Sequence, residues 1–179
     1  AVSPKEVKAM VQYQIGASQA FCKAAHIGLQ HVKPHGAMYN MAAKDEKLAY
    51  AIAEGIYEVD SGLILLGLSG SQLIKAGEET GLKVANEVFA DRAYQADGTL
   101  VPRSQKGAVI EEEETAVRRT IRMVQEGVVT SIDGAEIPIK AASVCLHGDG
   151  KKAVAFARLL QEQLTEAGVS IVPITQVIA

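Results

Sequence analysis

A continuous apolar run at residues 63–68 (LILLGL) constrains the fold of this chain more than any other feature. An unbroken run of this length, without polar alternation, is typical of a parallel strand that is covered on both faces. Shorter apolar segments recur along the chain and alternate with segments of helical periodicity. Strands are expected at 29–33, 63–68, 84–89, 142–146 and 169–174, and helices at 4–26, after Asp45, and at 71–80, 111–125 and 151–167.

This alternation predicts an α/β fold with a parallel sheet, in a single domain over residues 1–179. A long loop is expected at about 90–110, and a small hairpin at 128–131 and 136–139 around Asp133-Gly134. The main strands are too few for a closed barrel of parallel strands, which needs about eight. The chain therefore looks like the later two thirds of something larger.

The first expected helix carries a strong start signal. Ser3 is placed as the N-cap, Pro4 at the first helical position and Glu6 where a capping box needs it. A mostly apolar stripe then predicts the buried face of the helix, formed by Val7, Met10, Val11, Gln14, Ser18, Phe21, Cys22 and Ala25. The acidic run at 111–114 is interpreted in the same way, as the start of a helix and not as a metal cluster.

Composition excludes several classes of protein. A net charge of −3 gives no basic stripe for nucleic acid. No apolar run approaches the roughly 20 residues that span a bilayer, and the first residues lack the pattern of a signal peptide. The two cysteines, Cys22 and Cys145, have no metal-like spacing. We expect buried free thiols and a cytoplasmic protein.

Chemically active side chains follow the ends of the expected strands, where parallel α/β folds carry their active sites. Lys33 and His35 lie two positions apart and so face one side of an extended chain. The later strand ends bring Asp91 and Arg92, and then His147 and Asp149. Simpler roles exist for each: His35 as a backbone-bonded turn residue, Lys33 as a solvated lysine, Asp91 and Arg92 as a surface ion pair, and Asp149 as a helix N-cap.

Two chemistries fit these residues equally well. His35, Asp91 and His147 could ligate a zinc-like ion, or the same groups could act in acid–base catalysis. Residues 67–71 (GLSGS) resemble a phosphate cradle only loosely, because the Lys-Ser/Thr ending of a P-loop is missing.

At these residues the chain resembles the LamB/YcsF family. The matching stretches are 31–40 (HVKPHGAMYN), 87–94 (EVFADRAY), 97–104 (DGTLVPRS) and 144–149 (VCLHGD), and their order fits along essentially the whole chain. Met38 replaces the leucine expected there, a swap of little consequence. The Asp-Leu-Asn strand and the Cys-Gly-Phe-His-Ala-Gly-Asp segment at the start of the family pattern are not in this sequence, so roughly the first quarter to third of a family member is expected to be absent.

The resemblance implies an irregular (β/α) barrel of the glycoside hydrolase/deacetylase type, here incomplete. It implies ATP-dependent opening of the lactam of 5-oxo-L-proline to L-glutamate, with ATP as co-substrate and with 5-oxoprolinase subunits B and C as partners. A bound divalent metal and a homo-oligomer are left open. The site expected from these matches has His35, Asp91 and His147 as catalytic residues, and Lys33, Arg92, Arg103 and Asp149 as substrate-binding residues.

Two other functions remain as alternatives. One is a metal-dependent deacetylase or amidohydrolase of the polysaccharide deacetylase type, which would need no ATP. The other is a non-catalytic subunit that binds a small acid while its partners perform the chemistry.

Overall fold

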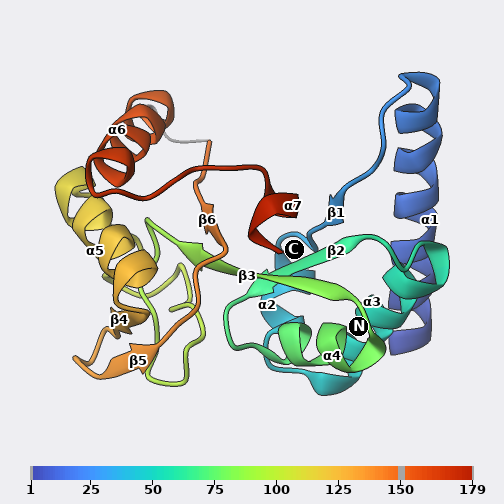
Figure 1. The fold of residues 1–179 in the computed structure, drawn as a ribbon. Helices are drawn as coiled ribbons and strands as arrows, with labels where there is room; N and C mark the ends of the chain where they lie inside the picture. The colour runs from blue at the N-terminus through green and yellow to red at the C-terminus, as the bar shows by residue number, and fades with distance from the viewer. Residues whose placement is uncertain (1, 149–151, 179) are drawn as a thin grey trace. The chain divides into compact units, whose positions relative to one another are not determined.

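The computed structural model describes residues 2–148 and 152–178. The chain divides into two compact units (Figure 1). The first holds residues up to Ala85 together with Ile178, and the second begins at Asn86. The organisation into a single domain stays a prediction.

Helix α1, Pro4–Ala24, begins as the sequence predicts. Ser3 accepts a hydrogen bond from the N–H of Glu6, and the Glu6 carboxylate accepts one from the N–H of Ser3, which completes a capping box. Of the predicted stripe only Val7 and Val11 are buried, and the third buried residue of the helix, Ile15, was not part of the prediction. For the rest of the stripe the prediction is wrong: Met10 is 42% exposed and Phe21 is 78% exposed.

Three further helices complete the first unit: α2 (Ala37–Ala42), α3 (Glu46–Val59) and α4 (Gln72–Thr80). Asp45 caps α3 by accepting a hydrogen bond from the N–H of Leu48, as expected. Gly81 ends α4 in the left-handed conformation, which glycine adopts without steric cost. Their apolar faces form one core with α1, made of Val7, Val11, Ile15, Ala42, Leu48, Ala49, Ile52, Ala53, Ile56, Leu63, Leu65, Leu73, Ala76 and Leu82.

The main sheet has the strand order β1-β2-β3-β6. Its strands are β1 (His31–Val32), β2 (Ile64–Leu68), β3 (Lys83–Phe89) and β6 (Ser143–Cys145). β1 pairs with β2 in parallel, and β3 pairs with β6 in parallel. Every residue of β2 is buried, as the apolar run predicts. The α/β fold with parallel strands is therefore confirmed.

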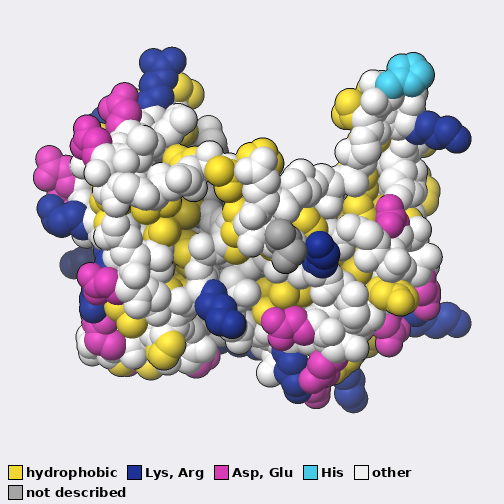
Figure 2. All heavy atoms as spheres, viewed as in Figure 1, with side chains coloured by type: hydrophobic (Ala, Val, Ile, Leu, Met, Phe, Trp, Pro, Cys, Tyr) yellow, Lys and Arg dark blue, Asp and Glu magenta, His cyan; other side chains and the backbone are white. Residues whose placement is uncertain are grey.

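The second unit contains the remaining elements: α5 (Glu113–Gln125), the antiparallel hairpin β4 (Val128–Thr130) and β5 (Glu136–Pro138), α6 (Ala153–Glu166) and α7 (Ile174–Val177). The acidic run does open a helix, with Glu112 as the N-cap of α5. Helices α5 and α6 pack together over a core of Ala90, Val117, Leu160 and Leu164. Acidic and basic side chains are intermixed on the outer surface around α5 (Figure 2).

Three expectations are corrected. Residues 169–174 do not form a strand: Ile171 is 57% exposed, none of the described strands pairs with this segment, and the short helix α7 begins at Ile174. Helix α2 was missed because Pro34 and Gly36 indicate a turn, and this short helix has no side-chain cap. Both cysteines are free, but they are half-buried instead of buried.

None of the helices in the part of the chain described here is long and apolar enough to cross a membrane.

Candidate functional site

The register of β3 and β6 creates the candidate site. Phe89 lies opposite Cys145 in this parallel pair. Asp91 and His147 each follow two residues after these partners, so the two side chains leave the sheet at the same edge and on the same side. The Oδ2 atom of Asp91 lies 2.7 Å from Nδ1 of His147. The structure thus joins two residues that the sequence places 56 positions apart.

The Asp91–His147 pair is partly shielded from solvent. The side chain of Asp91 is 19% exposed and that of His147 is 26% exposed. The ring of Phe89 lies with its centroid 6.0 Å from that of the imidazole. A carboxylate at Nδ1 fixes the orientation of an imidazole and favours the tautomer that carries its proton on Nδ1. The Nε2 atom is then the position that can accept a proton from a substrate or donate one to it.

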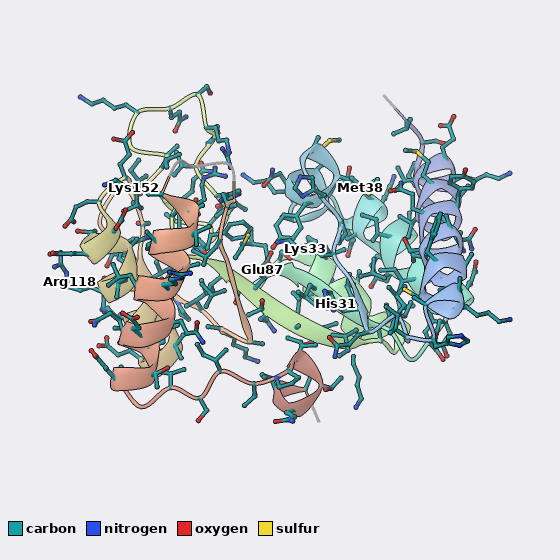
Figure 3. The ribbon with its side chains drawn as sticks, turned by 90° about the horizontal axis from the view of Figure 1, so that it is seen from above. His31, Lys33, Met38, Glu87, Arg118 and Lys152 are labelled. Carbon is teal, nitrogen blue, oxygen red and sulfur yellow. The ribbon has the colours of Figure 1, made fainter. Side chains whose placement is uncertain are left out.

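A cavity of about 330 Å³ opens beside this pair. Its lining combines charged and apolar side chains, all from the second unit: Asp91, Arg103, Val109, Ile110, Glu111, Glu113, Ala116, His147, Lys152, Ala153 and Phe156. Lys152 lies at the start of α6 (Figure 3). Its Nζ atom is 3.8 Å from Oε1 of Glu113 across the cavity lining. The cavity therefore combines two cations with three carboxylates, beside a histidine that can move a proton.

The loop at residues 90–110 is folded, and it fixes the backbone at Asp91. Ile110 donates its N–H to the Asp91 carbonyl oxygen at 2.9 Å. The Arg92 guanidinium donates to the carbonyl oxygens of Ala108, at 3.2 Å, and Val101, at 2.5 Å. These bonds close the two arms of the loop on each other.

The Arg92 side chain is therefore held by the backbone of its own loop, although it was predicted to bind substrate. It is only 5% exposed and is not among the residues that line the cavity. Burial lowers the pKa of its guanidinium, as does the charge of Arg103, while the Asp91 carboxylate acts in the opposite direction. Arginine still remains protonated at neutral pH. Its role toward substrate stays a prediction.

Tyr94 supports the end of β3 from the same loop. Its hydroxyl oxygen accepts a hydrogen bond of 2.9 Å from the N–H of Phe89. The side chain is fully buried, and burial raises the pKa of the phenol well above its ordinary value. A phenol that stays protonated holds the strand end through a neutral hydrogen bond, two residues before Asp91.

The predicted site residues separate into four groups, one of which is Arg92, buried in its own loop. Asp91, Arg103 and His147 meet at the cavity. Lys33 and His35 belong to the first unit, where the Lys33 ammonium lies 5.6 Å from the ring centroid of Tyr39 and the His35 side chain is exposed. Asp149 lies outside the described residues.

A metal centre was one of the two chemistries left open. Within residues 2–148 and 152–178, no three His, Cys, Asp or Glu side chains gather as a metal site would require. Of the set expected from the sequence, Asp91 and His147 bond to each other and His35 lies in the other unit. The contact between Asp91 and His147 is itself of the kind that acid–base catalysis uses.

Two features near the site were not singled out from the sequence. Glu87 is 2% exposed in β3 (Figure 3), and a charged residue between the apolar end of the strand, Val88–Phe89, and Ala85 is the signal that could have revealed it. The cavity pair Lys152 and Glu113 was missed because both residues look like ordinary charges at helix starts.

Comparison with known proteins gives a consistent result. The model of the LamB/YcsF family matches residues 1–179. A protein of Clostridium beijerinckii, named as the A subunit of 5-oxoprolinase, is 58% identical over 176 residues, which cover 98% of this chain and 69% of that protein. The Bacillus subtilis protein of the same name is 54% identical over 176 residues, covering 98% and 68%.

A solved structure agrees with the sequence comparison. The crystal structure of the lactam utilization protein from Thermus thermophilus superimposes with a TM-score of 0.87 at 44% identity. The match covers 96% of this chain and 68% of that one. The whole length of the chain thus carries both the sequence pattern and the fold of these proteins, and the chain belongs to the LamB/YcsF family.

Proposed function

We propose that the chain is part of the A subunit of a 5-oxoprolinase and that its Asp91–His147 pair takes part in hydrolysis of the lactam of 5-oxo-L-proline. The observation that carries the proposal is the 2.7 Å contact between Asp91 and His147 at the wall of a cavity that also holds two cations. Relatives named as the A subunit of 5-oxoprolinase and as a lactam utilization protein support it.

The chemistry needs a proton carrier and a site for an anion. Opening the lactam to glutamate adds one water: a C–O bond forms at the carbonyl carbon, the C–N bond breaks, and the leaving nitrogen takes a proton. In our proposal His147 moves that proton through Nε2 while Asp91 holds the imidazole. Arg103 and Lys152 bind the carboxylate of the substrate or phosphoryl oxygens. Lys33, His35, Arg92 and Asp149 keep their predicted roles.

ATP fits the reaction as an activating co-substrate, because a five-membered lactam is a stable amide. Phosphoryl transfer from ATP to the lactam oxygen would release ADP and activate the ring carbon. Water would then add to that carbon, the C–N bond would break to leave an acyl phosphate, and a second water would release phosphate and glutamate. The cavity itself carries three carboxylates, from Asp91, Glu111 and Glu113, against the cations of Arg103 and Lys152. That balance does not suit a free triphosphate. We therefore assign ATP to the whole complex, which on this proposal also contains subunits B and C.

The test is 5-oxoproline-dependent ATP hydrolysis and glutamate formation by the full-length protein with its two partners. His147→Gln should lower turnover by about a hundredfold or more, the usual scale for loss of a general acid or base. Asp91→Asn removes a charge-assisted hydrogen bond worth about 1.5–3 kcal/mol, so turnover should fall by roughly ten- to a hundredfold. His35→Ala tests whether His35 is also a catalytic residue.

His31→Gln is the matched control. His31 is an exposed histidine whose Nδ1 atom contacts the Gln30 side chain at 3.3 Å, and this substitution should leave turnover unchanged. Wild-type turnover in both His147→Gln and Asp91→Asn would remove the pair from the mechanism. Activity on acetylated sugars without ATP would support the deacetylase alternative in place of the lactamase.

A further inference from the structure

Arg119 contacts the backbone on both sides of Asp91. From α5, its Nη1 atom donates to the carbonyl oxygen of Ala90 and its Nη2 atom to that of Arg92, each at 3.3 Å. One planar guanidinium thus spans the two peptide groups that flank the carboxylate of the candidate site. A guanidinium suits this task because its N–H donors are held in a fixed, planar fork.

The environment of Arg119 distinguishes it from its neighbours on α5. Arg118 and Arg122 form ion pairs with glutamates at the surface, and Arg118 points outward (Figure 3). Arg119 is partly buried, and among the described residues no carboxylate lies within ion-pair distance of it. Burial lowers the pKa of its guanidinium. Taking a cation out of water is costly, and the two hydrogen bonds that Arg119 donates to carbonyl oxygens offset part of that cost.

The helix that carries Arg119 is itself anchored beside Asp91. Val117 of α5 belongs to the same core as Ala90, Leu160 and Leu164. The Asp91 carbonyl oxygen is held from the opposite arm of the loop by the N–H of Ile110. The peptide groups around Asp91 are therefore fixed by α5 and by the loop together.

From this arrangement we propose that Arg119 is a positioning residue: it fixes the backbone at Asp91 so that Oδ2 meets Nδ1 of His147. The effect on turnover rests on the proposed function, whereas the effect on the contact between the two side chains does not. Displacing a catalytic group by about 1 Å can cost up to about a hundredfold in rate.

The experiment compares Arg119→Gln and Arg119→Lys with the control Arg118→Gln. Proton NMR of the chain labelled with ¹⁵N-histidine reports the Nδ1–H of His147, which is shifted downfield when it is hydrogen-bonded to a carboxylate. Asp91→Asn identifies that resonance by its loss. Thermal unfolding verifies that each variant is folded, and kcat and KM are measured with the full-length protein in its complex.

We expect Arg119→Gln to lose or weaken the His147 resonance and to lower kcat by about ten- to a hundredfold, with KM changed less than kcat. Arg119→Lys reaches one carbonyl at a time and should be intermediate, and it replaces the glutamine variant as the test if that variant does not fold. Arg118→Gln should match the wild type in resonance and turnover.

Two results would overturn the proposal. One is a wild-type His147 resonance in a folded Arg119→Gln or Arg119→Lys variant. The other is equal loss of the resonance in Arg118→Gln, which would indicate a general effect of charge on α5. Unchanged turnover in Asp91→Asn and His147→Gln would refute the proposed function instead, and the resonance would still decide whether Arg119 positions Asp91.

Discussion

Gly77 in α4 packs closely against Val84 and Leu65, and we predict that Gly77→Ala destabilises the protein. A Cβ atom at this position would lie 2.6 Å from Cγ1 of Val84 and 2.9 Å from Cδ2 of Leu65. Favourable carbon–carbon contacts lie at about 3.5–4.0 Å, so both contacts are too short. Leu65 is fully buried and Val84 is β-branched, which limits how far either side chain can move.

The magnitude follows from two opposing effects. Forcing a methyl group into a packed core costs about 1–3 kcal/mol. Replacing glycine by alanine inside a helix returns about 0.5–1 kcal/mol. We therefore expect Gly77→Ala to lower the free energy of unfolding by about 1–2 kcal/mol.

Gly16→Ala supplies the matched control, because a Cβ atom built at Gly16 in α1 meets nothing within 4 Å beyond the adjoining backbone of its own helix. This variant should gain only the roughly 0.5–1 kcal/mol by which alanine is favoured over glycine inside a helix. Both variants gain this preference for alanine. The difference between their free energies of unfolding therefore isolates the overpacking cost of about 1–3 kcal/mol. Urea unfolding followed by far-ultraviolet circular dichroism measures both. Equal free energies of unfolding for Gly77→Ala and Gly16→Ala would refute the packing argument.

Three further predictions address a helix cap, a buried hydrogen bond and a surface ion pair. Ser3→Ala removes the N-cap of α1 and should cost about 1 kcal/mol in urea unfolding. Tyr94→Phe leaves the buried N–H of Phe89 without its acceptor and should cost about 1–3 kcal/mol; a melting temperature at the wild-type value would contradict this. Arg122 lowers the pKa of Glu136 below its ordinary value of 4.5, so this pair stabilises the fold above that pH and less as the pH falls below it. The difference in urea midpoint between wild type and Glu136→Gln should shrink from pH 7 to pH 3, and a constant difference would contradict the assignment.

Features encoded within a few residues were predicted correctly from the sequence. The capping box at Ser3 and Glu6 and the helix start at Asp45 both act on the helix end that they adjoin. The apolar run at 63–68 needed no knowledge of its neighbours, because a strand covered on both faces is apolar at almost every position. These signals act over a few residues, so they can be recognised without knowledge of the tertiary structure.

Predictions failed where a segment needed a partner. Residues 169–174 have the apolar content of a strand, but none of the described strands pairs with them. The stripe on α1 continues through Phe21, yet burial stops at Ile15. Periodicity shows which side chains could be buried, and only a packed neighbour determines whether they are.

The candidate site shows the same division. The strand-end pattern of the sequence selected Asp91 and His147 as chemically active residues, and the resemblance to the family added Arg103. Only the tertiary structure decided that Asp91 and His147 bond to each other, because that contact depends on the register Phe89–Cys145 across many intervening residues. It likewise assigned Arg92 to the carbonyls of its own loop. The residue types of a site can be read from the sequence alone. The contacts between those residues depend on strand register and burial, which are properties of the whole fold.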